Sequence, residues 1–248
     1  MDLALEVGVS PRHLSFVETG RSRPSPELVL AIADRLEVPL RERNTLLLAA
    51  GYAPRYTHRS LDDLALRQIR ASLQRMLDAH DPYPGVVIDR QWNVVLANRA
   101  AGALTTALPP ELAGPPLNVY RACLHPDGLA ALTLNFNEWA TYLLGQLRRS
   151  VALTADPELD QILAEVSRYP NVAVLATSPE LPADDPQLLI PLRLEVGGRE
   201  LSMFTTLTTF GTPRDVTLDE LAVELFFPAD ESSETLLRAA ADAPSARA

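Results

Sequence analysis

Residues 8–21 read GVSPRHLSFVETGR, and this stretch decides how the N-terminal part folds. Ser10 followed by Pro11 is typical of a helix start, because serine caps free backbone N–H groups and proline at the first helical position loses no hydrogen bond. Residues 1–7 predict an earlier short helix, and Gly8 suits its left-handed end. Helix, glycine turn and helix together predict a helix-turn-helix arrangement.

The next thirty residues contain the same kinds of helix-start and helix-end residues. A loop at 18–26 carries two arginines and ends in a second serine–proline start at Ser25. Apolar residues then recur at helical spacing as far as Leu36. A further helix is expected over 40–50, and Gly51 ends it. The first fifty residues therefore predict four short helices.

These residues resemble the Xre/Cro-type DNA-binding domain over residues 1 to about 50. The resemblance rests on the glycines and helix caps in register within GVS at 8–10, ETGR at 18–21, PS at 24–25 and LEVP at 36–39. It implies that the second helix reads bases in the major groove and that loop arginines reach phosphates. The residues implied to contact double-stranded DNA are Pro11, Arg12, His13, Ser15, Phe16, Arg21 and Arg23.

The arginines, His13 and Phe16 also have a plainer interpretation. Arg12 is the one base reader in the second helix that could bind guanine in a bidentate manner, yet any single arginine here could belong to a solvated face. His13 and Phe16 could form a half-buried packing pair. The family domain has five helices and this chain begins inside the second, so we expect a reader without its first helix. Two explanations of the missing first helix are open: the start codon is assigned too far downstream, or the DNA-binding domain is weakened.

The net charge of −10 is unevenly distributed. Residues 1–60 hold eight Arg against seven acidic residues, and residues 61–248 hold fourteen Arg against twenty-five; the chain has no Lys. The acidity therefore belongs to the C-terminal three-quarters, and the first quarter remains compatible with a nucleic-acid partner.

Composition and motifs exclude several classes. There is no apolar run of membrane-spanning length and no signal peptide, so a cytoplasmic protein without a membrane partner is expected. The single Cys123 excludes an internal disulfide. The four histidines show no metal spacing, and no phosphate-binding glycine motif or nucleophile motif occurs. We therefore expect no cofactor, no metal, no catalytic residue and no enzyme.

A junction follows the first module. Residues 61–79 show mixed three- and four-residue apolar spacing, which predicts an amphipathic helix. The run HDPYPG at 80–85 then breaks any helix. We predict domains at 1–55 and 81–241, a linker helix within 56–80 and a frayed tail at 242–248.

The C-terminal part alternates between strand and helix patterns. Two strands are expected within 86–97, followed by a helix that Asn98 caps, a helical turn over 118–124, and helices over 129–153 and from 156 to before 169. A loop at 177–186 precedes strands over 188–196 and 200–210, which flank the hairpin glycines 197–198. A last strand over 221–227 and a terminal helix follow. This order predicts an α+β domain with one five-stranded antiparallel sheet covered on a single face.

This part is similar to the ligand-binding domain of MmyB-like transcription regulators, a PAS-like fold. The resemblance rests on DPYP at 81–84, WNV at 92–94, HPDGL at 125–129, FGTP at 210–213, DVTL at 215–218 and FFPAD at 226–230. The fold class implied is an all-α helix-turn-helix domain, its first helix missing, followed by an α+β PAS-like domain. The family implies an effector pocket between sheet and helices, with fatty-acid-like ligands.

Such a pocket needs apolar walls and a few polar anchors. The candidate walls are the aromatic and methionine side chains Trp92, Phe136, Trp139, Tyr142, Met203 and Phe210. The candidate anchors are Asn98, Arg121 and His125. The alternative is that each aromatic is ordinary core and that Arg121 sits in a surface ion pair.

The hypothesis is a one-component bacterial transcription regulator that senses a small apolar or fatty-acid-like ligand. A homodimer is expected, because two half-sites one helical turn apart supply affinity that one short reader lacks. The alternative is a ligand- or protein-binding sensor that has lost DNA binding. Operator, regulated genes, sign of regulation and effector identity are not encoded in any visible pattern.

Overall fold

The computed structural model describes residues 2–175 and 188–242. The chain divides into two units. The first unit comprises Met1–Arg67 together with Phe210–Glu220, and the second comprises Gln68–Thr209 and Leu221–Ala248. The first unit is therefore discontinuous in sequence, because a segment from the C-terminal part of the chain completes it.

The first unit is helical. Its helices are α1 (Asp2–Glu6), α2 (Pro11–Glu18), α3 (Pro26–Arg35), α4 (Leu40–Ala49) and α12 (Val216–Glu220). Both serine–proline starts form as predicted: the Ser10 side chain accepts a hydrogen bond from the His13 N–H at 3.1 Å, and Ser25 accepts one from the Leu28 N–H at 3.2 Å. The four predicted helices are thus confirmed, whereas α12 was not expected from the sequence.

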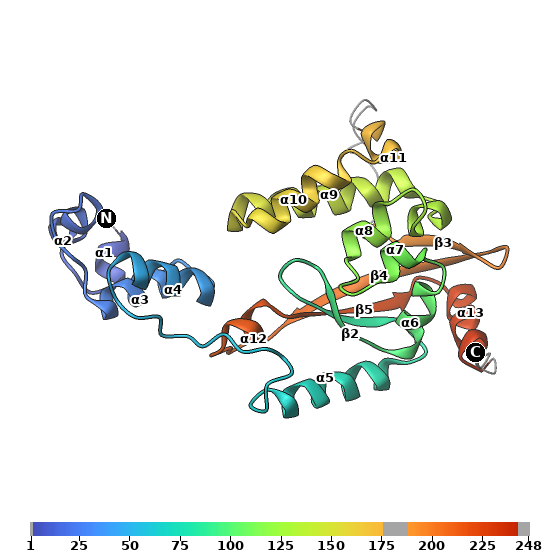
Figure 1. Cartoon of the computed structure of the whole chain (residues 1–248), viewed down its shortest axis with the longest axis horizontal. Coiled ribbons are helices and arrows are strands. Elements are labelled where there is room, and N and C mark those ends of the chain that lie inside the picture. The colour runs from blue at the N-terminus through green and yellow to red at the C-terminus, as the bar shows by residue number, and fades with distance from the viewer. Residues whose placement is uncertain (1, 176–187, 243–248) are drawn as a thin grey trace. The chain divides into compact units, whose positions relative to one another are not determined.

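The second unit is α+β. Its strands are β1 (Gly85–Ile88), β2 (Val94–Ala97), β3 (Leu192–Val196), β4 (Arg199–Thr209) and β5 (Ala222–Pro228). They form one antiparallel sheet in the order β2-β1-β5-β4-β3 (Figure 1). Gly197 and Gly198 both have positive φ, as the predicted hairpin turn requires. The predicted five-stranded antiparallel sheet is confirmed.

Helices of the second unit precede, follow and interrupt the strands. They are α5 (Arg67–His80), α6 (Arg99–Thr105), α7 (Pro110–Ala113), α8 (Val119–Leu124), the 3-10 turn η1 (Leu129–Leu132), α9 (Phe136–Thr154), α10 (Pro157–Val166), α11 (Pro170–Ala173) and α13 (Glu231–Asp242). As predicted, the Asn98 side chain caps α6 by accepting a hydrogen bond from the Ala101 N–H.

The main core lies between the sheet and helices α8, α9 and α10. Tyr120, Leu147 and Met203 are all fully buried there. The opposite face of the sheet is covered too, because α5 lies beneath it (Figure 1). His80 of α5 packs against Phe227 of β5 with ring centroids 4.9 Å apart. The expectation of a sheet covered on a single face is therefore wrong.

Two predicted helices are shorter than expected. The helix expected from residue 61 begins at Arg67, because the Asp63 carboxylate accepts a hydrogen bond from the Ala65 N–H and closes a turn that competes with helix. The helix expected over 129–153 is interrupted at 133–135, where the Leu134 N–H donates to the Arg193 carbonyl beside β3. A tertiary contact overrides the local pattern there.

Two predictions fall at the limits of the described residues. The loop predicted at 177–186 lies outside them, and so does the predicted tail at 242–248 apart from Asp242, which ends α13. Within the described part of the chain, no helix has both the length and the apolar character needed to cross a bilayer.

Candidate functional site

The first six residues of α2 include the predicted base readers. Pro11, Arg12 and Ser15 are exposed, and His13 and Phe16 are half-buried. The Arg12 guanidinium lies over the Phe16 ring, 5.3 Å from its centroid. Stacking of this kind holds a long side chain in one direction while leaving its N–H groups free to bind. The five residues share one turn-and-a-half of helix, as a groove-reading helix requires.

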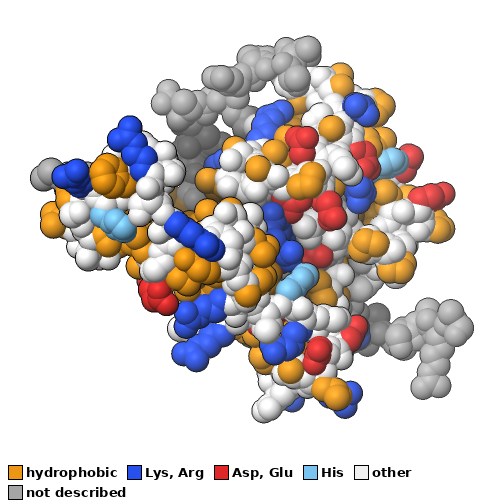
Figure 2. Space-filling model, turned by 60° about the vertical axis from the view of Figure 1, so that its left-hand side comes forward, with side chains coloured by type: hydrophobic (Ala, Val, Ile, Leu, Met, Phe, Trp, Pro, Cys, Tyr) orange, Lys and Arg blue, Asp and Glu red, His pale blue; other side chains and the backbone are white. Residues whose placement is uncertain are grey.

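The loop after α2 places Arg21 at the surface. Gly20 adopts a positive φ, and the N–H groups of Arg21 and Ser22 both donate to the Phe16 carbonyl at 2.7 and 3.0 Å. This closes the helix end in the way that glycine caps do. The Arg21 side chain is exposed beside the same helix. The space-filling view shows basic side chains spread over the visible face of the first unit (Figure 2).

Arg23 is differently placed. Its guanidinium donates to the carbonyls of Ala50 and Gly51 at 2.8 and 2.9 Å, and it lies 4.5 Å from the centroid of the Tyr52 ring. These carbonyls end α4, where a cation offsets the negative end of the helix dipole. The structure thus gives Arg23 a role in holding α4 to the loop after α2.

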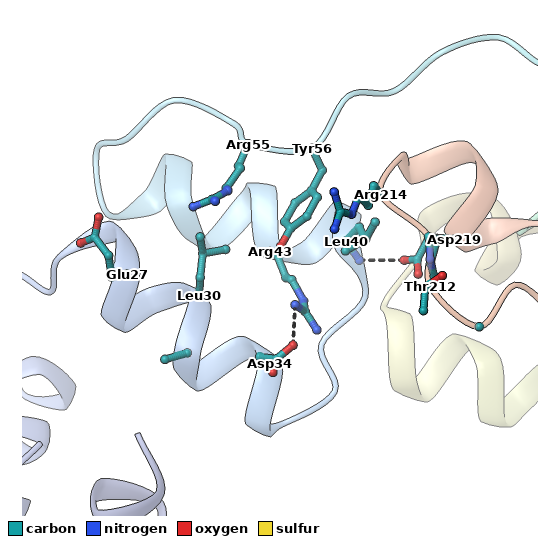
Figure 3. A pocket seen from close by; sticks show the side chains of 13 residues that line it. Glu27, Leu30, Asp34, Leu40, Arg43, Arg55, Tyr56, Thr212, Arg214 and Asp219 are labelled. Atoms are coloured by element: carbon teal, nitrogen blue, oxygen red, sulfur yellow. Dashed lines mark hydrogen bonds and ion pairs between the residues drawn. The ribbon is translucent and has the colours of Figure 1, made fainter. Parts of the chain in front are cut away.

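The segment Phe210–Glu220, which joins β4 to β5, belongs to the first unit. The Asp219 carboxylate accepts a hydrogen bond from the Leu40 N–H at 2.8 Å and so caps α4, whose own preceding residue, Pro39, offers no side-chain cap. Figure 3 shows this bond beside the ion pair of Arg43 with Asp34. The segment and helices α3 and α4 enclose a cleft of about 910 Å³.

Further polar contacts fix this segment. Glu220 forms a bidentate ion pair with Arg41 at 2.5 and 2.8 Å. Asp215 is buried, and its carboxylate accepts from Thr57 at 2.7 Å and from Arg59 at 2.9 Å. Sequence reasoning missed all of these residues as partners of the helical unit, because more than 150 positions separate them along the chain.

Phe210 was predicted to line the effector pocket together with residues of the sheet. It instead falls in the first unit, one residue beyond the end of β4. The strand pattern that extends through residue 210 stops at Thr209, because the chain leaves the sheet there. Phe210 therefore belongs to a different unit from the other predicted wall residues.

The remaining wall residues lie in the second unit. Trp139 and Tyr142 of α9 pack at a tilt of 36° with ring centroids 5.4 Å apart. With Phe204 and Thr205 of β4 they line a hollow of about 380 Å³, which we call the Tyr142 hollow. Trp92 packs on Tyr120 in the core, 5.1 Å between centroids, and Met203 is fully buried. Phe136 is half-buried against the same core.

The predicted polar anchors are engaged elsewhere. Asn98 accepts from the N–H groups of Gly85 and Ala101 and donates to the carbonyls of Leu77 and Tyr83, so its amide is fully used. None of Asn98, Arg121 and His125 lines any of three hollows formed by the described residues of the second unit. The expected anchoring set is therefore not brought together.

Arg121 and His125 have partners of their own. The Arg121 guanidinium forms a bidentate pair with Glu165 at 2.7 to 3.0 Å, which lowers the pKa of that carboxyl. The His125 ring packs edge-on against Tyr169 at 4.9 Å and accepts the Asp127 N–H. The ion-pair alternative for Arg121 is the one the structure shows.

A second hollow, of about 90 Å³, lies against the same face of the sheet and contains Glu224 of β5, Cys123 of α8, Val86 and Phe226; we call it the Glu224 hollow. Glu224 is 7% exposed. Burial raises its pKa to about 7, and the Thr205 hydroxyl, which donates to it, works in the opposite direction. The sequence signal for it was a lone carboxylate within the otherwise apolar strand 221–227.

Other groups at this hollow are equally removed from water. Burial raises the pKa of the Cys123 thiol to about 12, so this cysteine is no nucleophile at neutral pH. Burial also raises the pKa of Tyr120. Within residues 2–175 and 188–242, the Tyr120 hydroxyl has no hydrogen-bond partner, and no cluster of three potential metal ligands occurs.

A third hollow, of about 580 Å³, lies between α6, α13 and the turn from β3 to β4. Its lining is apolar apart from Arg99 and Arg199. Arg99 lies 3.8 Å from Asp81 and donates to the Ala241 carbonyl. Among the described residues, none of the predicted ligand contacts lines this hollow.

Two family models match this chain, and the longer match, unlike the division into units, includes Phe210–Glu220. Residues 69–240 match the MmyB-like transcription regulator ligand binding domain, and residues 2–43 match a helix-turn-helix family. The PAS domain of BvgS from Bordetella pertussis is similar to 70% of this chain over 96% of its own, at 14% identity and a TM-score of 0.30, which is too low to support any conclusion. No curated protein sequence matches the chain.

The two matches follow one another along the chain, and the longer covers most of it. A helix-turn-helix and an effector-type domain in one polypeptide indicate a DNA-binding transcription regulator with a ligand-binding domain. The chain belongs to the family of MmyB-like transcription regulators.

Proposed function

We propose that the protein reads double-stranded DNA with the N-terminal half of α2 and adjusts that binding when a small apolar effector occupies its second unit. The observation that carries the proposal is the exposure of Arg12 and Ser15 at the start of α2, with Arg12 supported by Phe16. Arg12 then supplies a bidentate contact to guanine. Pro11, His13 and Phe16 complete the surface that enters the groove.

Arg21 and Arg23 take different parts in this proposal. Arg21 is exposed at the loop and contacts a phosphate, which orients the protein without reading sequence. Arg23 holds the end of α4 through the Ala50 and Gly51 carbonyls and supports the reading surface indirectly. A substitution of Arg23 therefore affects the fold of the first unit before it affects any DNA contact.

The effector occupies the hollows between the sheet and helices α8 and α9. Apolar lining by Val86, Phe226 and Trp139 suits a hydrocarbon body, and about 380 Å³ in the Tyr142 hollow falls within the usual range of ligand pockets. The acyl-chain part of a fatty-acid-like ligand fits this lining. The carboxylate part has lost its expected anchor, because Arg121 is paired with Glu165.

The segment Phe210–Glu220 offers a route between the two activities. It is tied to α4 by Asp219 and Glu220, and its two ends continue directly into β4 and β5. An effector that favours one arrangement of these strands would shift the equilibrium between states of the reader, provided that it binds one state better than the other. The protein works as a homodimer on two half-sites, in the cytoplasm and without catalysis.

The test is DNA binding by the full chain. Fluorescence anisotropy with fragments of the promoter region of its own gene, measured from 50 to 200 mM salt, should give an affinity that falls steeply with salt. Arg12→Ala should weaken binding, whereas Arg148→Ala, an exposed arginine on α9, should leave it unchanged. Absence of binding to every fragment at low salt would contradict the proposal and favour a sensor that does not bind DNA.

A further inference from the structure

The sheet register aims Glu224 at the core. In β5, Glu224 pairs with Val86 of β1 and Leu207 of β4. Side chains alternate between the two faces of a strand, so Glu224 shares its face with Phe226, which packs in the core, whereas Phe227 points to α5. A carboxylate in this position is placed on the face that helices α8 and α9 cover.

The groups around Glu224 come from each element packed against that face. Thr205 of β4 donates its hydroxyl hydrogen bond to Glu224. Tyr120 and Cys123 of α8 and Tyr142 of α9 lie near enough for the charge of Glu224 to raise the pKa of each. In the described residues no basic side chain pairs with Glu224.

Two further polar groups at this place lack strong partners. The Tyr120 hydroxyl, on a fully buried residue, has no partner within the described residues. The Trp139 ring N–H is buried and directed to the sulfur of Cys123, a weak acceptor. Buried polar groups are nearly always hydrogen-bonded. Trp139 lines the Tyr142 hollow, so its weakly satisfied N–H marks a place for a polar atom of a ligand, whereas Tyr120 lines neither hollow.

The charge that a ligand's head group should carry follows from the charged groups around Glu224. A buried carboxylate without a cation is costly, and so Glu224 keeps its proton below about pH 7. A ligand carboxylate placed beside it would add a like charge in a medium of low dielectric constant. An ammonium or hydroxyl head donates to Glu224 instead.

We infer that the effector of this protein carries a hydrogen-bond-donating head group, an amine or hydroxyl, which binds Glu224 while its hydrocarbon body fills the Glu224 hollow and the Tyr142 hollow. This inference rests on the proposed ligand-binding role of the second unit and names the chemistry of that ligand. Glu224 is the specificity-determining residue, and carboxylates are disfavoured.

Three probes of equal chain length test the inference on the full chain: octylamine, octan-1-ol and octanoate. Because both tryptophans, Trp92 and Trp139, lie in the second unit, their fluorescence reports binding there. We expect affinity to fall in the order amine, alcohol, acid. Glu224→Gln should weaken octylamine about tenfold or more, since a hydrogen bond to a charged group is lost, and Glu195→Gln, an exposed carboxylate on β3, should change nothing.

The pH dependence adds a readout that a purely structural role for Glu224 would not give. Octylamine pairs with the ionised carboxylate, so its binding releases the Glu224 proton. Its affinity should therefore rise by up to about tenfold per pH unit below pH 7 and level off above it. In Glu224→Gln this slope should vanish while thermal unfolding still shows a folded second unit.

The outcomes separate this inference from the proposed function. Octanoate that binds as tightly as octylamine, or an octylamine affinity that Glu224→Gln leaves unchanged, overturns the inference and leaves the DNA-binding regulator intact. Failure of all three probes to bind overturns it as well, because the inference requires the donor-headed probes to bind. Loss of promoter binding in the anisotropy experiment contradicts the proposed function alone, since probe binding is measured without DNA.

Discussion

Each of the two units of this chain is stabilised internally in a different way. The second unit has a continuous apolar core, in which Tyr120, Leu147 and Met203 are fully buried between sheet and helices. The first unit buries small or medium side chains such as Ala33 and Leu47, and polar contacts from Asp215, Asp219 and Glu220 complete it. The comparison shows that a small helical unit can be stabilised by polar contacts from a segment that is distant in the sequence.

The largest expected effect comes from cutting into the core of the second unit. Leu147→Ala removes a fully buried side chain on α9 and should lower the free energy of unfolding by about 2–5 kcal/mol. Tryptophan fluorescence in a denaturant titration measures it, because both tryptophans report on this unit. Leu153→Ala on the same helix, at 86% exposure, is the control. Equal effects of the two would disprove the central position of Leu147.

Glu224 is the one carboxylate with a raised pKa, about 7, that interrupts the apolar core among the described residues, and it makes stability pH-dependent. Its folded-state pKa lies above the unfolded value near 4.5, so the folded state binds the extra proton between these values. Stability should therefore fall as pH rises from about 4.5 to 7. Across this range the free energy of unfolding of Glu224→Gln should rise by up to about 3 kcal/mol relative to that of wild type.

Fluorescence-detected unfolding at pH 5 and pH 8 tests this sign. A wild-type protein whose advantage over Glu224→Gln grows with pH would contradict it. Glu195→Gln should follow wild type at both values, since Glu195 is exposed.

Substitutions on the proposed DNA-binding surface of the first unit should change DNA binding without changing the core. Arg12→Ala should cost about 1–3 kcal/mol of binding free energy on a specific promoter and relax the preference at one base pair. Arg21→Ala should weaken all sequences alike and reduce the salt dependence. If Arg12→Ala behaves like Arg21→Ala, then Arg12 contacts a phosphate and the base-reading assignment is wrong.

The smallest expected effect tests the contact between Asp219 and the start of α4. Asp219→Ala removes the cap of α4 and should destabilise the first unit by about 0.5–2 kcal/mol. Circular dichroism at 222 nm follows both units, whereas tryptophan fluorescence follows the second unit alone. The helical signal should therefore melt earlier while the fluorescence transition stays in place. Asp127→Ala, with a side chain 81% exposed, should shift neither.

Local patterns predicted most of the architecture. Serine–proline starts, the asparagine cap at Asn98 and the glycine pair at 197–198 all act within a few residues, so their effects can be read from short stretches. The interruption at 133–135 could not be predicted, because the Arg193 carbonyl that causes it lies about sixty residues away.

The candidate site was predicted less completely for the same physical reason. Arg121 was placed correctly on α8, but its direction depends on Glu165 of α10. Phe210 follows a strand pattern, yet the chain leaves the sheet at Thr209. Glu224 was overlooked because inward-facing strand positions are expected to be apolar, and the exception gains meaning only when Thr205 and Tyr120 are seen beside it.

The insertion of Phe210–Glu220 into the helical unit has a consequence for protein engineering. A cut near Arg67 in this chain would leave α4 without Asp219 and Arg41 without Glu220. A working transplant must therefore carry the strand-joining segment along with the first sixty-seven residues, or supply a substitute cap for α4 from the new host.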